Sequence, residues 1–202
     1  MATIAETISS ASTKATRLLV ILLGAAVFLN YVDRGAIGIA APLMKSDLGL
    51  SEEAYGVAFS AFFWIYAPVQ LFAGWLCDRF SVYKLMAGGI LLWAVSTLLM
   101  GFAGGFVSLL VLRVMLGVGE SISFPGSSKL IARHVPPERR GVANAAVATG
   151  LALGPAVGTL VGGLILGSWG WHAIFLIFGA VTLTWLLPWQ QTMKALPAAE
   201  VH

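Results

Sequence analysis

Long apolar runs separated by short polar segments fill most of the chain between residues 18 and 189. Each run is about 17 to 27 residues long, and a helix needs ~20 apolar residues to cross the ~30 Å hydrocarbon core of a bilayer. The pattern therefore predicts a bundle of six transmembrane helices across residues 18–190, with terminal tails at residues 1–17 and 191–202. The predicted helices lie at residues 18–44, 54–76, 85–102, 107–131, 142–166 and 173–189.

The composition supports an all-α integral membrane protein. Hydrophobic residues make up 58% of the chain and charged residues 10%, whereas a soluble domain carries about 25% charged residues. The mean hydropathy is +0.89. The formal net charge is +3, but the basic residues are spread along short loops rather than gathered on one face, which argues against a nucleic-acid partner. The expected surroundings are a lipid bilayer.

The distribution of lysine and arginine predicts the orientation, because cytoplasmic loops of membrane proteins are enriched in both. If the N-terminus is cytoplasmic, Lys45 lies outside and Arg34 and Arg113 lie within helices. The remaining basic residues are then cytoplasmic: Lys14, Arg17, Arg79, Lys84, Lys129, Arg133, Arg139, Arg140 and Lys194. We therefore expect a multi-pass protein of the cytoplasmic (inner) membrane with both terminal tails in the cytoplasm.

Four charged residues interrupt the apolar runs: Asp33 and Arg34 in the first predicted helix, and Arg113 and Glu120 in the fourth. A charge near the bilayer centre costs several kcal/mol, so such residues normally face a bundle interior or an aqueous cavity and mark an ion or substrate path. Arg113 and Glu120 are seven residues apart and share a helix face. At their expected depth, Asp33 and Arg34 come close to the level of Arg113. Transport is therefore the leading hypothesis.

The residue types predict a division of roles between these charges. An arginine presents a planar fork that fits a carboxylate or phosphate, so Arg34 and Arg113 are candidate binding residues for an organic anion. Burial disfavours the charged form of a carboxyl group, which suits Asp33 and Glu120 to reversible proton binding. Protonation of a carboxylate would free its arginine partner for substrate. The alternative is that the four residues form two ion pairs that only hold helices together.

Two tyrosines add hydrogen-bonding groups at membrane depth, Tyr31 in the first helix and Tyr66 in the second. Their hydroxyl groups suit a hydroxylated substrate, and both are candidate substrate-binding residues. The alternative is that each one bonds to a neighbouring helix.

The segment from Gly74 to Lys84 separates the second and third predicted helices and contains Asp78 and Arg79. Glycine allows close helix packing, and Asp78 can pair with cytoplasmic cations to latch one conformation. The pattern resembles the cytoplasmic signature of the major facilitator superfamily, with Ser81 and Tyr83 where glycine and a basic residue are usual. The resemblance implies a conformational latch that involves Gly74, Asp78, Arg79 and Lys84.

Further segments resemble the anion:cation symporter branch of that superfamily. They are Asn30-Tyr-Val-Asp-Arg34, the stretch from Arg113 through Glu120 to Phe124-Pro125, the Pro-Pro-Glu-Arg-Arg-Gly loop, and Gly170-Trp171. Proton-coupled members of this branch import organic anions such as sugar acids. The resemblance implies proton coupling for Asp33 and Glu120, and substrate or coupling roles for Arg34 and Arg113.

Members of the superfamily have two six-helix halves around a central site, each half built of inverted three-helix repeats. The six predicted helices match the N-terminal half. We therefore expect a truncated product, a fragment of a longer gene, or a half that pairs with another chain. Alternating access needs a second bundle, so the expected partners are a C-terminal half or second chain, an organic anion and protons. A non-transporting sensor or partner subunit is a rival interpretation.

The fifth helix contains Gly150-Leu-Ala-Leu-Gly154-Pro155-Ala-Val-Gly158-Thr159. This segment resembles the glycine-proline signature of antiporters in the same superfamily, with Thr159 in place of the final glycine. Small residues also allow close helix packing, and proline bends a helix. We favour packing for Gly150, Gly154, Pro155 and Gly158, and an exchanger remains the alternative mechanism.

An enzyme is not expected. His134, His172 and His202 fall in a loop, at a membrane interface and at the terminus. No nucleophile with an adjacent base and no cluster of metal ligands is recognisable in the sequence. We therefore predict no cofactor and no metal.

Overall fold

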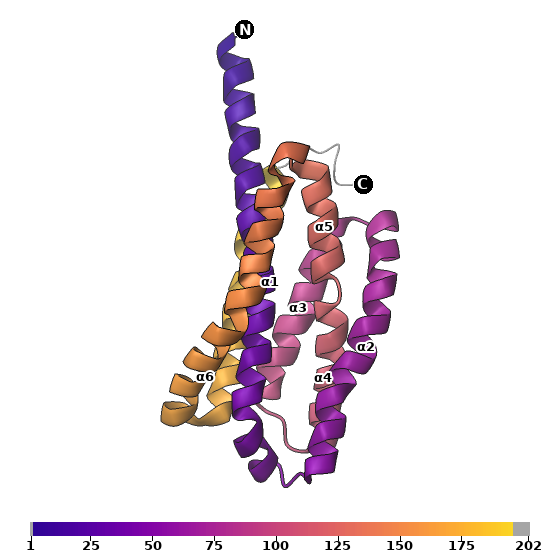
Figure 1. The fold of residues 1–202 in the computed structure, drawn as a ribbon, viewed down its shortest axis with the longest axis vertical. Helices are drawn as coiled ribbons and strands as arrows, with labels where there is room; N and C mark the ends of the chain where they lie inside the picture. The colour runs from indigo at the N-terminus through magenta and orange to yellow at the C-terminus, as the bar shows by residue number, and fades with distance from the viewer. Residues whose placement is uncertain (1, 196–202) are drawn as a thin grey trace.

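A computed structural model describes residues 2–195, with side chains described for residues 14–194. Its elements are α1 (Ala2–Asp47), α2 (Glu52–Arg79), α3 (Val82–Met100), α4 (Phe106–Glu120), α5 (Ser123–His134), a 3-10 turn η1 (Pro137–Arg139), α6 (Arg140–Thr184) and α7 (Leu186–Ala195). No strand occurs within residues 2–195. The predicted all-α fold is confirmed, and Figure 1 shows the helices running roughly along one axis.

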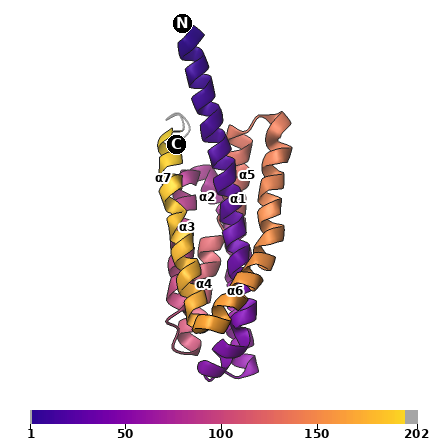
Figure 2. The ribbon, with the colours of Figure 1, turned by 90° about the vertical axis from the view of Figure 1, so that its left-hand side faces the viewer.

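Five helical segments among the described residues are long and apolar enough to cross a membrane. The longest, Pro137–Lys194, contains two of the six predicted spans. It turns back at Gly170, whose φ of +77° lies in a region that residues with a Cβ rarely adopt. Figure 2 shows the orange part of α6 descending beside α1 and the yellow part returning towards α7. The predicted span at residues 107–131 is divided into α4 and α5 by a short break at residues 121–122.

Several helices extend further than their apolar runs. The predicted tail is helical from Ala2 onwards, because residues 2–17 contain no glycine or proline to stop α1. The polar turn before α3 shortens to residues 80–81, which places Asp78 and Arg79 in the last turn of α2. The predicted tail at 191–202 begins as the end of α7, and its residues 196–202 lie outside the described part of the chain.

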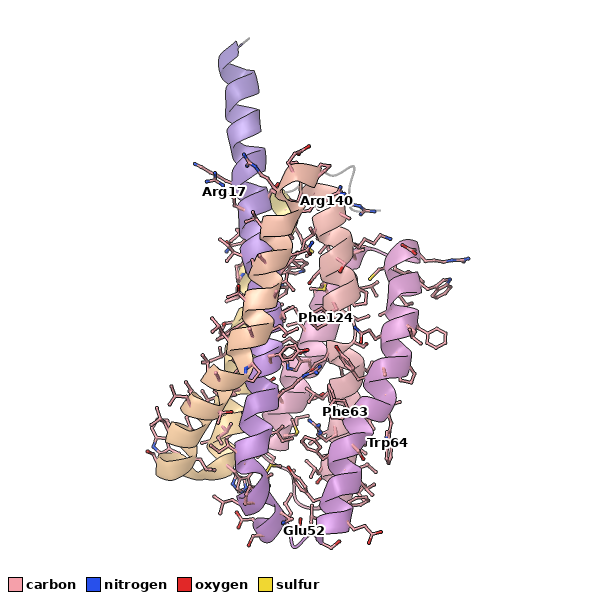
Figure 3. The ribbon with its side chains drawn as sticks, in the orientation of Figure 1. Arg17, Glu52, Phe63, Trp64, Phe124 and Arg140 are labelled. Atoms are coloured by element: carbon pink, nitrogen blue, oxygen red, sulfur yellow. The ribbon has the colours of Figure 1, made fainter. Side chains whose placement is uncertain are left out.

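Charged residues mark the two ends of the bundle. Figure 3 places Arg17 and Arg140 near one end and Glu52 at the other. The end with Arg17 and Arg140 is the one predicted to face the cytoplasm. Between the two ends, Phe63 and Trp64 of α2 lie on the outside of the bundle, 47% and 60% exposed.

The most extensive helix contact joins α1 to α6. Three glycines of α6 lie against the α1 backbone. A Cβ atom on Gly150 would lie 2.6 Å from the Gly24 carbonyl oxygen, and one on Gly158 would lie 2.1 Å from that of Val32. Gly154 is equally crowded. These distances leave no room for a side chain, which supports the packing interpretation of the glycine segment.

We predict that Gly158→Ala destabilises the bundle by about 1–3 kcal/mol, because the added methyl group must push α1 and α6 apart. The matched control is Gly167→Ala in the same helix, where an added Cβ meets nothing within 4 Å. The thermal stability of both variants is measured from the loss of helical circular dichroism on heating in detergent. Equal melting of the two variants would show that the α1–α6 contact does not depend on Gly158.

Candidate functional site

The four intramembrane charges lie in the interior of the bundle. Asp33, Arg113 and Glu120 are 6%, 4% and 0% exposed, and the side chain of Arg34 is 23% exposed. Asp33 and Arg34 are neighbours on α1, and consecutive residues of a helix point about 100° apart. They therefore make different direct contacts, and Arg34, unlike Asp33, forms an ion pair with a charged residue of α4.

Arg34 forms an ion pair with Glu120 that joins α1 to α4. Its Nη2 and Nε atoms donate to Glu120 Oε2 at 2.9 and 3.3 Å. A fully buried carboxylate is costly unless a cation compensates it. From its position along the first helix, Arg34 is expected near the level of Arg113, and its direct partner in the structure is Glu120.

Aromatic rings surround the Arg34 guanidinium. Its central carbon lies 4.7 Å from the ring centroid of Tyr31, 4.8 Å from that of Tyr66 and 5.0 Å from that of Phe62. Such distances are typical of cation–π interactions. Tyr31 in turn packs edge-on against Phe124, which Figure 3 labels near mid-height of the bundle. The rings hold the guanidinium in place, and 23% of the Arg34 side chain stays exposed.

Arg113 contacts the ring of Phe62 as well. Its guanidinium carbon is 4.8 Å from the centroid of Phe62 and 4.8 Å from that of Phe59, and its Nη2 donates to the Phe59 carbonyl oxygen at 3.0 Å. Its buried Nε has no hydrogen-bond partner among the described residues. Two arginines from two helices thus share Phe62, and Arg113 keeps unused donors.

Asp33 belongs to a separate polar contact. It accepts hydrogen bonds from Trp93 Nε1 at 2.5 Å and Thr97 Oγ1 at 3.1 Å, both on α3. It also lines a groove between α1 and α6 together with Thr182. Asp33 and Arg34 therefore make their direct contacts with different helices, because Asp33 bonds to α3 while Arg34 pairs with Glu120 of α4.

Sequence reasoning missed Phe59, Phe62, Trp93 and Thr97. Their spacing was a usable signal, because Phe59 and Phe62 lie on the same face of α2 as Tyr66, and Trp93 and Thr97 are one turn apart on α3. Which face meets which arginine depends on helix rotation in the bundle.

The predicted latch has one clear contact. Asp78 pairs with Lys129 of α5, whose Nζ also donates to the Cys77 carbonyl oxygen at 2.6 Å. Arg79 instead lies over the ring of Trp75, 5.1 Å from its centroid. Lys84 is exposed in the first turn of α3, and an added Cβ on Gly74 would meet nothing within 4 Å. The structure therefore links Asp78 to a cation that the sequence analysis had not singled out.

Tyr83 forms a second link at this end of the bundle. Its hydroxyl group is hydrogen-bonded to His134 Nε2, and its carbonyl oxygen accepts from Trp189 Nε1 at 3.1 Å. Tyr83 thus ties α3 to the end of α5 and to α7.

The described residues contain no group of three or more histidine, cysteine, aspartate or glutamate side chains placed to hold a metal ion.

Comparison with protein families gives one match over most of the chain. A protein-family model described as Major Facilitator Superfamily matches residues 23–199. Among curated relatives, a probable sulfoacetate transporter of Cupriavidus necator is 38% identical over 160 residues, which cover 79% of this chain and 37% of that protein. A probable galactarate/D-glucarate transporter of Bacillus subtilis is 34% identical over 171 residues, which cover 82% of this chain and 38% of that protein. The matched part of this chain therefore covers less than two fifths of each of these relatives.

A solved structure has the same fold. It is the crystal structure of a bacterial homolog to the human lysosomal transporter Spinster, in an inward-facing and unoccupied conformation. The TM-score is 0.83 at 23% sequence identity, and the match covers 91% of this chain and 44% of that one.

We predict that Arg34 and Glu120 are energetically coupled. In a double-mutant cycle of Arg34→Gln and Glu120→Gln, we expect a coupling energy of about 1–3 kcal/mol. Arg34→Gln alone should be the most damaging variant, because it leaves the buried carboxylate without a cation. Thermal unfolding in detergent gives the stabilities of the unmodified protein, the two single variants and the double variant.

The control cycle uses Lys45 and Glu52, which form an ion pair between more exposed side chains at the opposite end of the bundle from Arg17. Such surface pairs contribute about 0–1 kcal/mol. A coupling no larger for Arg34 and Glu120 than for this pair would contradict a structural role for the buried ion pair.

Proposed function

Because this chain belongs to the major facilitator superfamily, we propose that it forms the N-terminal half of a transporter for small organic anions. The observation that carries the proposal is the contact of both Arg34 and Arg113 with the ring of Phe62, 5.0 and 4.8 Å from its centroid. Two fixed guanidinium groups in a buried, aromatic setting favour an anion, because each one binds a carboxylate or sulfonate oxygen through parallel N–H donors.

The proposed substrate is a sugar acid or another small carboxylate. Tyr31 and Tyr66 support this choice, because both rings touch Arg34 and carry hydroxyl groups that can bond to a hydroxylated substrate. The names of the two relatives support the same class of substrate, since galactarate, D-glucarate and sulfoacetate are all small organic anions.

We propose that Glu120 couples anion binding to protons by competing for Arg34. While Glu120 is ionised, it occupies the Nε and Nη2 donors of Arg34. Protonation removes the negative charge of Glu120, and an anionic substrate can then take its place on the arginine. One proton on Glu120 offsets one negative charge of the substrate, so a monoanion leaves the total charge of the site unchanged. The second negative charge of a dianion such as galactarate would be compensated by Arg113.

Asp33 is proposed as a second proton-binding group with a different mechanical effect. Its carboxylate holds Trp93 and Thr97 of α3. Protonation would weaken both hydrogen bonds, since bonds to an ionised acceptor are the stronger ones. Asp33 would therefore loosen α1 from α3 rather than bind substrate.

Transport requires a second six-helix bundle, because alternating access is a rocking of one half against the other around a central site. We propose that a C-terminal half, or a second chain, completes the protein in the inner membrane with the Arg17 end in the cytoplasm. In this arrangement the contact between Asp78 and Lys129 acts as part of a cytoplasmic latch, with Gly74, Arg79 and Lys84 beside it.

Uptake into proteoliposomes tests the proposal once this chain is assembled with a C-terminal half. With an inward proton gradient, we expect accumulation of galactarate or sulfoacetate. Arg34→Gln and Arg113→Gln should each lower initial uptake by about 10- to 100-fold, the loss typical of a charged binding contact. Glu120→Gln and Asp33→Asn should remove the dependence on the gradient.

Lys194→Gln is the control, because it removes one exposed cytoplasmic charge far along the chain from the site. Full uptake by both arginine variants would contradict the proposed anion site. Gradient-driven uptake that survives in both carboxylate variants would exclude Glu120 and Asp33 from proton coupling.

A further inference from the structure

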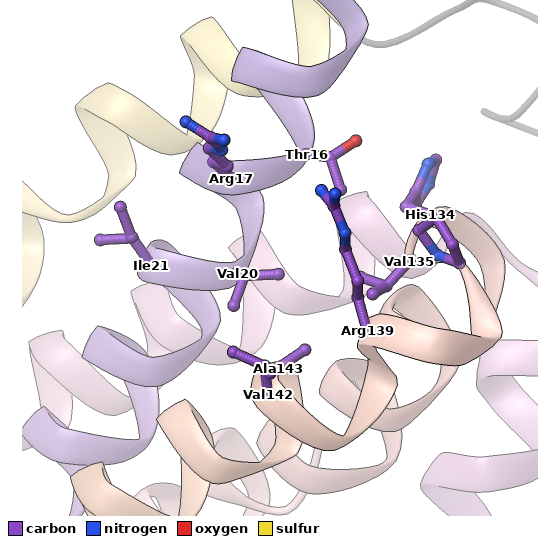
Figure 4. Close-up of a pocket in the computed structure, with 10 residues that line it drawn as sticks. Thr16, Arg17, Val20, Ile21, His134, Val135, Arg139, Val142 and Ala143 are labelled. Atoms are coloured by element: carbon purple, nitrogen blue, oxygen red, sulfur yellow. The ribbon is translucent and has the colours of Figure 1, made fainter.

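A cavity of about 610 Å³ opens at the Arg17 end of the bundle, between α1 and the start of α6. Figure 4 shows its walls: Arg17, Val20 and Ile21 come from α1, and Arg139, Val142 and Ala143 come from the η1–α6 segment. None of these residues belongs to the Arg34–Glu120 site.

The cavity continues along the bundle as a shallow hollow. Ile21 lines both spaces, and the hollow follows α1 through Gly24 and Ala25 to Phe28, with Ala146 to Leu153 of α6 on the other side. We call the two spaces together the α1–α6 groove. From Arg17 to Phe28 the groove is ~16 Å long at 1.5 Å per residue, about half of a ~30 Å hydrocarbon core.

The mouth of the groove is cationic. Figure 4 shows the guanidinium groups of Arg17 and Arg139 above the apolar side chains of Val20 and Ala143. Both arginines are exposed, and neither takes part in the salt bridges found among the described side chains. One arginine on each wall gives a site for a phosphate group, because each guanidinium can donate two parallel hydrogen bonds to its oxygens.

The rest of the groove is open and mostly apolar, with Thr149 as a polar residue along its length. Ile21, Val142 and Leu153 are 64%, 74% and 53% exposed. The floor is smooth, because Gly24 lies against the Ala146 backbone and has no side chain to obstruct it. A groove with charge at the membrane surface and exposed aliphatic side chains over the depth of one leaflet matches the shape and polarity of a phospholipid.

We propose that the α1–α6 groove binds an anionic phospholipid of the cytoplasmic leaflet. The phosphate lies between Arg17 and Arg139, and one acyl chain runs past Ile21 to Phe28. The bound lipid bridges the two helices whose glycine contact fixes the position of α1. The proposal concerns lipid binding and does not depend on the transport substrate.

Native mass spectrometry of the purified full chain tests the proposal, with phosphatidylglycerol and phosphatidylcholine as the probes. We expect tighter binding of phosphatidylglycerol. Arg17→Gln and Arg139→Gln should each lower the affinity for phosphatidylglycerol about fivefold, because one arginine near an anionic lipid surface usually contributes about that much. The double variant should lower the affinity about 25-fold. Phosphatidylcholine binding should change little.

Lys194→Gln is the charge-matched control, and it should bind phosphatidylglycerol as the unmodified chain does. Retention of helical circular dichroism in the arginine variants separates loss of the lipid from loss of the fold. Equal affinity for the two lipids, or equal weakening by Lys194→Gln, would overturn the proposal. Displacement of phosphatidylglycerol by millimolar inorganic phosphate would overturn it in favour of a free-anion site, and displacement by a C-terminal half would identify the groove as a protein interface.

Discussion

The ion pair between Arg34 and Glu120 is the interaction on which the candidate site depends. Glu120 is completely buried in α4, and its carboxylate would be strongly unfavourable there without a cation. Arg34 reaches it from α1, and the rings of Tyr31, Phe62 and Tyr66 fix the guanidinium in that position. In the proposed mechanism an incoming anion competes with Glu120 for this guanidinium, so Arg34 would serve both stability and binding.

The contact between α1 and α6 makes this arrangement possible. Backbone-to-backbone packing at Gly150, Gly154 and Gly158 fixes α1 in height and rotation, because any sliding would bring side chains into the glycine contacts. With α1 fixed, Arg34 faces α4 while Asp33 faces α3. The glycine segment therefore has a sufficient explanation in packing.

Much of this organisation could be predicted from the sequence. The apolar runs predicted six spans, and the charges within them indicated the residues of the site. The contacts of each charged residue could not be predicted, because they depend on how each helix is rotated in the bundle. Asp33 and Arg34 are adjacent in sequence yet contact different helices. The aromatic surroundings of Arg34 and Arg113 were also missed, since Phe59 and Phe62 look like ordinary lipid-facing residues. Lys129 was missed as the partner of Asp78 because 51 residues separate them.

The central claim is that Glu120 and an anionic substrate compete for Arg34. Its most direct test is the affinity of the assembled protein for galactarate, measured by calorimetry across neutral pH for the unmodified protein and Glu120→Gln. The account predicts weaker binding by the unmodified protein as pH rises, because ionised Glu120 reclaims Arg34. It also predicts tight, pH-independent binding by Glu120→Gln, whose neutral amide no longer competes as an anion. The same fall in affinity with rising pH in both proteins would contradict the account.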